Sequence, residues 1–337
     1  MSDWGQPVLY SLYIYQPNNI APIIFAVLYG ISAVLHIWQC IRYKAFKLAG
    51  LLPTCAVLFT LGYALREYGA YNYLYRRTDK TALIVYITSQ ISIYVCPPLL
   101  ELANYHILAR MFSYVPFFAP IPASLVLRTF GGLMAIVEAL NALGVALASN
   151  PTSSPTTQAV GSHVSIAAIS IQLAVIVSFF LVAGLFQYRL GRARLRVRTV
   201  QTLLYALYAS MALILARCIY RLVEHLGPSH KNIADMDALW ALSPLFRYEI
   251  FFLVFEAILM LLNSLLWNAW HPARYLPRET HVYLAQDGTE VEGEKEVDGR
   301  NLGQKVAHVL SFGLLFRHNV RNYAALELTA REGGASQ

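Results

Sequence analysis

The sequence predicts an all-α, polytopic membrane protein, a bundle of seven transmembrane helices. Three observations support this fold class. Hydrophobic residues make up 57% of the 337 residues and charged residues only 13%, whereas soluble domains average about 25% charged residues. Seven stretches are apolar over the roughly 20 residues that a helix needs to cross a bilayer. Arginine and lysine gather in some connecting loops and are missing from others, which is the charge bias of oriented membrane proteins.

The seven spans are expected at residues 21–41, 48–68, 82–109, 124–148, 163–187, 201–220 and 245–270. Basic residues close the first span, beginning at Arg42. Pro97 and Pro98 lie within the third span, where we expect a kink, because neighbouring helices can bind the carbonyls that proline leaves free. Together the spans form a transmembrane domain over residues 21–271.

Loop charge predicts the orientation. The loop between the fifth and sixth spans carries only basic charges, at Arg189, Arg192, Arg194, Arg196 and Arg198. The loop at residues 150–162 carries no charge. We therefore expect the arginine-rich loop and the C-terminus in the cytoplasm and residues 1–20 outside, although Arg76 and Arg77 oppose this assignment. The expected location is the plasma membrane, with an endomembrane as the alternative.

The chain beyond the last span, residues 272–337, is polar and acidic. Such a composition predicts a cytoplasmic, largely disordered tail. Within the tail, apolar and basic residues near residues 303–318 favour a helix that lies on the inner leaflet.

The last span carries three polar side chains at regular intervals. Glu249, Glu256 and Asn263 are seven residues apart, so one helix face presents all three. A charge at the bilayer centre costs about 2.5–3.5 kcal/mol on insertion scales, which indicates a partner or a function. We assign the three residues to a hypothetical substrate-binding site, with Glu256 near mid-membrane and without an obvious local cation.

The sixth span ends in Arg217, Arg221 and Glu224, for which we expect structural or gating ion pairs. The simplest structural pair joins Arg217 or Arg221 to Glu249 across the loop between the two spans. A structural pair and a functional role are equally compatible with the two arginines.

Other spans add polar residues to the interior. Glu101, Asn104 and Tyr105 lie on one face just after the proline kink, and Glu138 lies in the fourth span. Hydrogen bonding between helices would explain any one neutral polar residue. Several acids together indicate an interior that receives a cation or an amine-bearing amphiphile, so Glu101, Asn104 and Glu138 join the predicted substrate site.

Several chemistries lack their motifs. The sequence contains no GxxxxGK[ST], HExxH or GxSxG and no paired Cys or His ligand set, which argues against ATP coupling within the chain, zinc hydrolysis and a serine nucleophile. We therefore expect no enzymatic activity, no cofactor and no metal. The basic loops are explained by orientation and give no reason to expect a nucleic-acid partner. The expected partners are the lipid bilayer and an amphiphilic or sterol-like ligand.

Two runs carry a family resemblance, LILARCIYRLVEHLGP at residues 213–228 and FRYEIFFLVFEAILMLLNSLLWNAWHP at residues 246–272. They resemble the fungal lipid-translocating exporters, the RTA-like resistance proteins. The matching positions are Arg217, Arg221, Glu224, Glu249 and His271-Pro272. Where members usually carry an aromatic-Asp turn, this chain has Phe255-Glu256. The resemblance implies seven spans and the export or translocation of sphingoid bases or other amphiphiles, with resistance to toxic sterol-like compounds.

Three functions follow as hypotheses. The first is a translocator of amphiphilic lipids whose carboxylates bind an ammonium headgroup while the tail stays in the bilayer. The second is a receptor-like lipid sensor, which seven spans and a basic inner loop fit equally well. A membrane enzyme that acts on lipids is the weakest alternative, because no nucleophile or metal-ligand set stands out.

Overall fold

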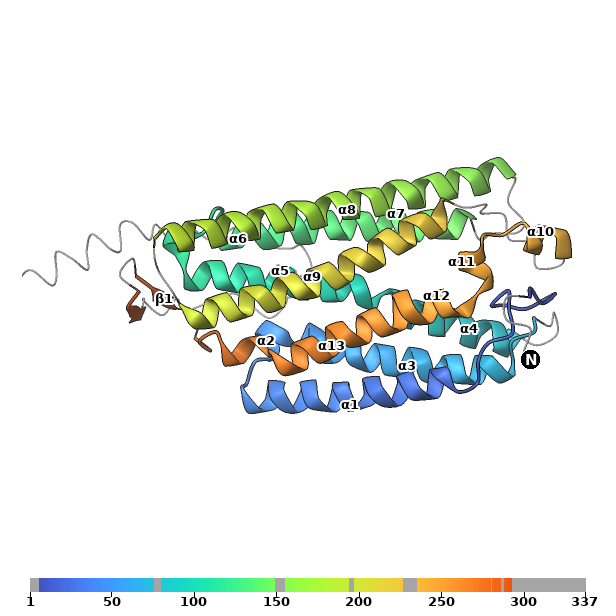
Figure 1. The fold of residues 1–337 in the computed structure, drawn as a ribbon, viewed down its shortest axis with the longest axis horizontal. Helices are drawn as coiled ribbons and strands as arrows, with labels where there is room; N and C mark the ends of the chain where they lie inside the picture. Colours follow the sequence, from blue (N-terminus) through green and yellow to red (C-terminus); the bar gives the residue numbers. More distant parts are fainter. Residues whose placement is uncertain are drawn as a thin grey trace, which may run out of the picture.

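The computed structural model describes residues 6–75, 80–148, 155–193, 197–226, 235–279, 281–285 and 288–292. Long helices run side by side along one axis and form an elongated bundle (Figure 1). The long helices are α1 (Ala21–Arg42), α3 (Leu51–Tyr71), α4 (Lys80–Tyr94), α5 (Cys96–Tyr114), α7 (Gly132–Ala148), α8 (Pro155–Arg192), α9 (Arg198–His225) and α13 (Leu259–Ala269). The fold class expected from the sequence is confirmed.

Shorter elements join and extend these helices. They are the α-helical turns α2 (Phe46–Ala49), α6 (Ala123–Val126), α10 (Met236–Trp240), α11 (Pro244–Arg247) and α12 (Glu249–Phe252), the 3-10 turns η1 (Pro116–Phe118) and η4 (Pro272–Arg274), the π-helical turns η2 (Leu127–Gly131) and η3 (Leu253–Ile258), and the strands β1 (Val282–Leu284) and β2 (Glu290–Glu292). In the last span, α12, η3 and α13 follow one another without a break.

Among the described residues, six helical stretches are long and apolar enough to cross a membrane. They are Ala21–Arg42, Lys80–Tyr114, Ala123–Gly144, Thr156–Arg192, Arg198–His225 and Glu249–Arg274. Helix α3 lies beside α1 and α4 as the seventh member of the bundle (Figure 1). The sequence therefore located the spans well. It underestimated α8, which at 38 residues is far longer than a bilayer crossing requires.

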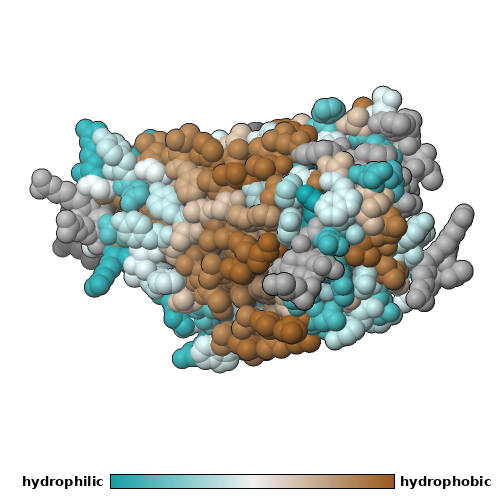
Figure 2. Space-filling view, turned by 45° about the vertical axis from the view of Figure 1, so that its right-hand side comes forward, coloured by the Kyte–Doolittle hydropathy of each residue, from teal (hydrophilic) through white to brown (hydrophobic). Residues whose placement is uncertain are grey.

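An apolar belt surrounds the middle of the molecule. Figure 2 shows this belt as a brown band, with hydrophilic residues towards both ends of the bundle. Large side chains in the belt point away from the protein, for example Val34 at 67% exposure and Leu181 at 70%. Such exposure would be costly in water and is favourable in hydrocarbon, so the belt marks the part that lies within the bilayer.

The predicted proline kink is present. The third span divides into α4 and α5 at Val95, and Pro97 and Pro98 occupy the first turn of α5. Proline fits the first turn of a helix because the amide hydrogen that it lacks would have no partner there. The chain therefore changes direction at this point and continues across the bundle.

The helices are arranged around a central group. Helices α1, α3 and α4 pack on one side and α7 and α8 on the other, while α5, α9 and the last span lie between them (Figure 1). Tyr29 on α1 stacks on Phe59 and Tyr63 of α3, with ring centroids 4.5 Å and 5.4 Å apart. Helices α5, α9 and the last span hold most of the buried polar side chains described below.

Residues 6–20 fold over one end of the bundle instead of extending away from it. Ser11 and Leu74 form an antiparallel β-bridge, flanked by hydrogen bonds from Leu12 N to Tyr73 O and from Tyr75 N to Tyr10 O. We call residues 6–20 the N-terminal cap. The cap is held at several points and covers the ends of the central helices.

The opposite end carries a two-stranded hairpin. Strands β1 and β2 pair in antiparallel register, with Tyr283 opposite Val291, and the Tyr114 hydroxyl of α5 donates to Glu290 Oε1 at 2.6 Å. The described part of the tail, residues 272–279, 281–285 and 288–292, thus includes a hairpin that docks on α5, and the expectation of a largely disordered tail stays a prediction for the rest. The rest of the tail, with the helix expected near residues 303–318, lies outside the described residues.

Candidate functional site

One face of the last span holds polar side chains from end to end. Its members are Glu249, Glu256, Asn263, Ser264, Asn268 and His271. All but Glu249 are buried, and side chains from α1, α3 and α9 meet them inside the bundle. Asn104 of α5 joins them through Ser210 of α9. We call these residues and their hydrogen-bonded partners the polar column. The seven-residue spacing correctly predicted a shared face for Glu249, Glu256 and Asn263.

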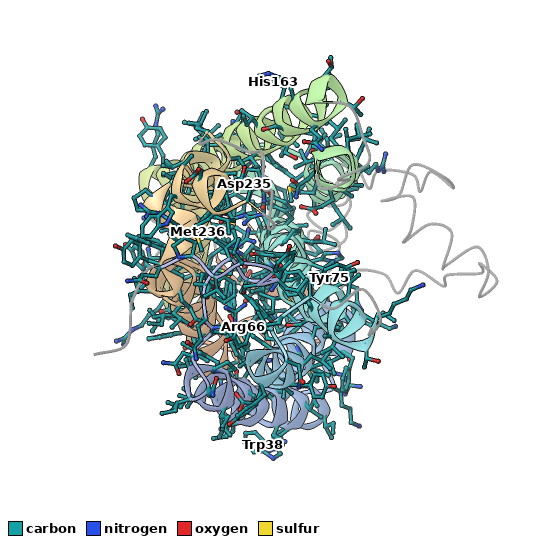
Figure 3. All side chains as sticks on the ribbon, turned by 90° about the vertical axis from the view of Figure 1, so that its right-hand side faces the viewer. Trp38, Arg66, Tyr75, His163, Asp235 and Met236 are labelled. Atoms are coloured by element: carbon teal, nitrogen blue, oxygen red, sulfur yellow. The ribbon has the colours of Figure 1, made fainter. Side chains whose placement is uncertain are left out.

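The column begins beneath the N-terminal cap with an ion pair. Arg66 Nη2 of α3 donates to Glu249 Oε1 at 2.8 Å and to the Tyr15 hydroxyl at 3.0 Å. The Arg66 guanidinium also lies over the rings of Tyr13 and Phe252, with Cζ 4.7 Å and 4.1 Å from the centroids. Figure 3 looks onto this end and shows Arg66 near its middle. Contacts with aromatic faces supplement the ion pair, because a guanidinium is attracted to a ring's negative face.

The cap contributes directly to this pair. The backbone amide of Asn18 donates to Glu249 Oε2 at 2.7 Å. Burial raises the pKa of the Tyr15 hydroxyl, so this group stays protonated while it accepts from Arg66. Glu249 is therefore held by α3 and by the cap together. The expected pair between Glu249 and Arg217 or Arg221 is wrong, because Arg66 occupies that carboxylate.

A second ion pair lies deeper in the column. Arg217 Nε is 2.9 Å from both carboxylate oxygens of Glu256, and Arg217 Nη2 is 2.6 Å from Oε1. Glu256 is fully buried and sits in the π-helical turn η3, a turn type that recurs at functional sites. The expectation that Glu256 lacks a nearby cation is wrong. The sequence failed here because Arg217 was assigned to the end of its helix.

The third pair joins two residues of α9. Arg221 Nη1 is 2.5 Å from Glu224 Oε2, and Arg221 Cζ lies 4.5 Å from the centroid of Tyr94. Arg217, Arg221 and Glu224 therefore all take part in ion pairs, and their structural or gating role stays a prediction. Each of the three acids Glu224, Glu249 and Glu256 has its own arginine.

Neutral hydrogen bonds continue the column past the ion pairs. The Ser210 hydroxyl of α9 accepts from Asn104 Nδ2 at 2.8 Å and from Trp267 Nε1 at 3.0 Å, and donates to Asn263 Oδ1 at 2.9 Å. Helices α5, α9 and α13 thus meet at one hydroxyl. Asn104 and Asn263 were both predicted site residues, and the structure brings them together through Ser210.

The column ends with side chains of α1. The Ser32 and Ser264 hydroxyl oxygens are 2.7 Å apart, and Asn268 Nδ2 donates to Ser32 Oγ at 2.5 Å. Gln39 Nε2 donates to the backbone carbonyl of Asn268 at 2.8 Å. His271, fully buried, lies 3.9 Å from Cys40 Sγ. The polar residues therefore reach the end where α2 and the hairpin lie (Figure 1).

Several polar atoms in the column keep unused hydrogen-bonding capacity. His36 Nδ1, Gln39 Oε1 and Asn268 Oδ1 are buried and have no hydrogen-bond partner among the described residues. Because native proteins rarely leave buried polar atoms unpaired, each such atom calls for an explanation. A polar headgroup or water in the column would bind them.

Glu101 and Glu138 stand apart from the ion pairs. Glu101 on α5 is fully buried and accepts hydrogen bonds from the Tyr105 hydroxyl and from Gln172 Nε2 of α8, the latter at 2.8 Å. Glu138 on α7 is half-buried. The contact between Glu101 and Tyr105 agrees with their four-residue spacing on one helix face.

Sequence reasoning missed Arg66, Ser210 and Trp267. Arg66 lies within the expected second span, residues 48–68, but no role was assigned to it. A charge inside an apolar span was the signal that could have identified it. Nothing local marks Ser210 or Trp267, since serine and tryptophan are ordinary residues of membrane helices.

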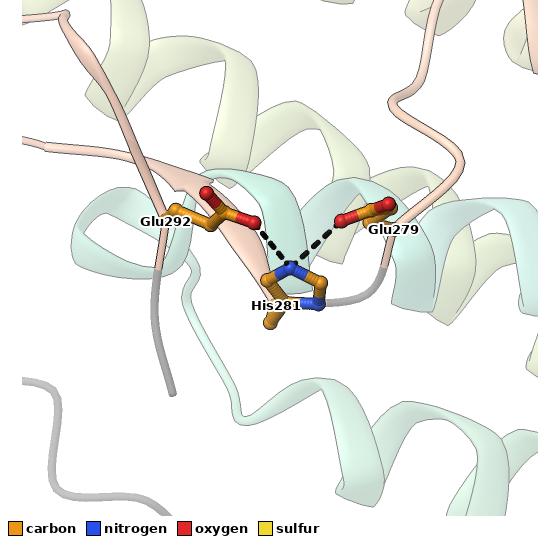
Figure 4. A group of neighbouring side chains, drawn as sticks. All are labelled: Glu279, His281 and Glu292. Carbon is orange, nitrogen blue, oxygen red and sulfur yellow. Dashed lines mark hydrogen bonds and ion pairs between the residues drawn. The ribbon is translucent and has the colours of Figure 1, made fainter. Parts of the chain in front are cut away.

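A separate polar group lies in the hairpin, outside the spans. His281 Nε2 is 2.8 Å from Glu279 Oε2 and 2.9 Å from Glu292 Oε1 (Figure 4). The three ligand atoms lie within 4.8 Å of one another, close enough to surround a metal ion. Both glutamates are more than half exposed. The contacts of His281 with Glu279, which precedes β1, and with Glu292 of β2 explain why the three side chains lie together without a metal ion.

Comparison with known proteins places these features in a family. The model of the RTA1-like protein family matches residues 53–279, a range that includes all three ion pairs. No solved structure matches the chain.

Three relatives are similar over most of the chain. Lipid-translocating exporter-like protein RTA1 of Leptosphaeria maculans is 52% identical over 315 residues, which cover 92% of this chain and 60% of the relative. A protein of the same name from Ajellomyces capsulatus is 29% identical over 66% of this chain and 70% of its own length. Probable lipid transporter atnI of Emericella nidulans is 23% identical over 79% of this chain and 68% of its own length. The chain thus spans about 60% of the length of the first relative.

Proposed function

The chain belongs to the RTA1-like family, and from this premise we propose that it moves an amphiphilic lipid between the two leaflets of a membrane. Relatives that are named a lipid-translocating exporter-like protein and a probable lipid transporter support the proposal. The ligand class that we favour is an amine-bearing amphiphile such as a sphingoid base.

The observation that carries the proposal is the polar column itself. It extends from Arg66 and Glu249 at one end of the bundle to His271 at the other and draws on five spans. A translocated lipid must bring its headgroup through hydrocarbon, where an unsatisfied polar group costs several kcal/mol. A row of hydrogen-bonding side chains lowers that cost by replacing water along the path.

A groove on the bilayer-facing side offers a place for the lipid tail. Ala209, Ala212 and Leu213 of α9 face Leu262, Leu265, Leu266 and Trp270 of the last span around a volume of about 510 Å³. Ser210 and Asn263, the neighbours of Ala209 and Leu262, belong to the polar column. The same two helices thus present polar groups inward and an apolar groove outward, which suits a ligand with one polar and one apolar end.

The ion pairs decide how a headgroup enters. Glu256 and Glu249 cannot bind an ammonium group while Arg217 and Arg66 hold them. We therefore infer that the pairs open in turn, with an ammonium replacing a guanidinium and a phosphate or hydroxyl group binding the released arginine. Glu249, Glu256, Asn104 and Asn263 remain the proposed contacts of the headgroup, whereas Glu101 and Glu138, which lie apart from the ion pairs, are not among these contacts.

The proposed orientation places the N-terminal cap outside the cell and the hairpin in the cytoplasm. Arg42, Lys47, Arg189 and Arg198 all lie at or near the end of the bundle that carries α2 (Figure 1). Positive charge collects on the cytoplasmic side of membrane proteins, and this supports the assignment. The plasma membrane is the proposed location.

A vesicle assay tests the proposal. The purified chain is reconstituted with a fluorescent long-chain amine in both leaflets, and a quencher that cannot cross the membrane reports the outer-leaflet fraction. Protein-dependent movement lets the quencher reach the inner-leaflet probe, whereas protein-free vesicles keep that fraction protected. Saturable binding of the amine without movement would contradict translocation and identify the chain as a lipid sensor, since the closed ion pairs also fit a ligand-gated switch.

A further inference from the structure

The acids inside the bundle fall into two groups. Glu224, Glu249 and Glu256 each bind an arginine, and these three pairs sum to zero charge. Glu101 and Glu138 form no ion pair with any described residue. Glu101 and Glu138 are therefore two carboxyl groups that no arginine among the described residues neutralises.

Glu101 has the more demanding environment of the two. It is fully buried, and its two carboxyl oxygens accept from the Tyr105 hydroxyl and from Gln172 Nε2, both of which are neutral donors. Burying an ionised carboxylate without a cation is costly even after relaxation. The two hydrogen bonds offset only part of that cost, because neither donor carries a positive charge.

The charged and titratable groups that face Glu101 come from three helices. Tyr105 lies on α5 itself, Glu138 on α7, and Arg217 and Cys218 on α9. Arg217 already shares Nε and Nη2 with Glu256, so it gives Glu101 no hydrogen bond. Glu138 is a like charge, and two neighbouring carboxylates disfavour each other's ionisation.

From this geometry we propose that Glu101 is a proton-binding site and that its proton couples lipid movement to a pH gradient. The coupling rests on the proposed function, whereas the proton site does not. A proton from water binds Glu101 Oε1, the Tyr105 hydroxyl turns to accept from it, and the carboxyl becomes neutral. The proton returns to water on the opposite side in a later step of the cycle.

The proton site is tested without any lipid substrate. Infrared difference spectra of the purified full chain in nanodiscs detect the C=O stretch of a protonated carboxyl during a pH titration. The wild-type protein should show such a band, Glu101→Gln should lose it, and Glu67→Gln, at the far end of α3, should keep it. An unchanged band in Glu101→Gln, or no band in the wild type, would overturn the site.

The coupling is tested in vesicles that carry a pH gradient and the fluorescent long-chain amine. One proton per lipid shifts the steady-state distribution of the amine between leaflets by up to about tenfold per pH unit. The protonated amine also responds passively to the gradient, so protein-free vesicles and a quaternary ammonium analogue serve as controls. Glu101→Gln should still move the analogue without a gradient but should lose the gradient-driven shift.

The two ideas fail in different ways. A gradient-driven shift that is the same in Glu101→Gln and in the wild type would overturn the coupling. A wild-type protein that moves neither probe would overturn the proposed function, and the infrared result would still decide whether Glu101 binds a proton.

Discussion

At the scale of single residues, the two acids of the last span each meet a partner from a distant part of the chain. Glu256 meets Arg217, which is 39 positions away, and Glu249 meets Arg66, which is 183 positions away. The seven-residue spacing predicted that Glu249, Glu256 and Asn263 share a face. It could not predict Arg66, since spacing on one helix contains no information about which other helix packs against it.

The Arg217–Glu256 pair gives the first prediction. Removing one partner of a buried pair costs about 3–5 kcal/mol because the other charge is left unpaired. We expect Glu256→Gln to lower the melting temperature and the abundance of the protein. The double variant Arg217→Gln/Glu256→Gln should regain stability, because it buries no unpaired charge.

The double variant also separates structure from function. If the pair opens to bind a headgroup, the stable double variant moves the fluorescent amine much more slowly than the wild type. Movement at the wild-type rate would show that the two charges only hold the helices together.

Arg66 gives the second prediction. Its guanidinium donates to Glu249 and lies between the rings of Tyr13 and Phe252, and lysine cannot reproduce this planar geometry. Arg66→Lys should loosen the N-terminal cap and raise hydrogen exchange of residues 6–20. The matched control Arg42→Lys, at the other end of the bundle, should leave exchange in the cap unchanged, and unchanged exchange in Arg66→Lys would refute this role.

At the scale of elements, the N-terminal cap is the part most suited to move. Ile14 has a φ of 76°, a strained backbone conformation for a β-branched residue, and its side chain packs on Leu239 and Leu242. Backbone strain persists where surrounding contacts impose it and often marks a switch region. The cap covers the Arg66–Glu249 pair, so a headgroup that enters from this end must displace the cap.

A disulfide across the β-bridge tests whether the cap opens. Ser11 and Leu74 face each other as a non-hydrogen-bonded antiparallel pair, a position whose Cα separation of about 4.5 Å suits a disulfide. Ser11→Cys/Leu74→Cys should slow lipid movement when oxidised and recover it in reductant. The four native cysteines are buried, so they should not interfere.

Two results would argue against an opening cap. The single variant Ser11→Cys should behave like the wild type in both redox states, and a redox effect there would point to an unrelated cause. Undiminished movement in the oxidised double variant would show that the headgroup enters without displacing the cap.

Other elements mark where sequence reasoning ended. The break at Val95 followed from Pro97 and Pro98, whose missing amide hydrogens are local properties. The π-helical turn at Leu253–Ile258 could not be predicted, because no local residue marks it and the partner of its Glu256, Arg217, lies on another helix. The hairpin at residues 282–292 was missed for a similar reason, since its contacts come from α5.

At the scale of the whole molecule, composition and hydropathy were sufficient for the bundle but not for its interior. Apolar stretches located the long helices, and their apolar side chains form the belt seen in Figure 2. The column arises only when five spans pack so that their polar faces coincide. Charge balance inside the bundle is likewise a property of the assembled helices, and it distinguishes Glu101 from the paired acids.

The whole account depends on the polar column being the path of the headgroup. The direct measurement uses a lipid with a photoreactive group on its headgroup, irradiated in vesicles that contain the purified chain, with labelled residues mapped by mass spectrometry. We expect label on Asn263, Ser264 and Asn268, which face the column. Label confined to Leu262 and Leu265, which lie on the same helix but face the bilayer, would contradict the account.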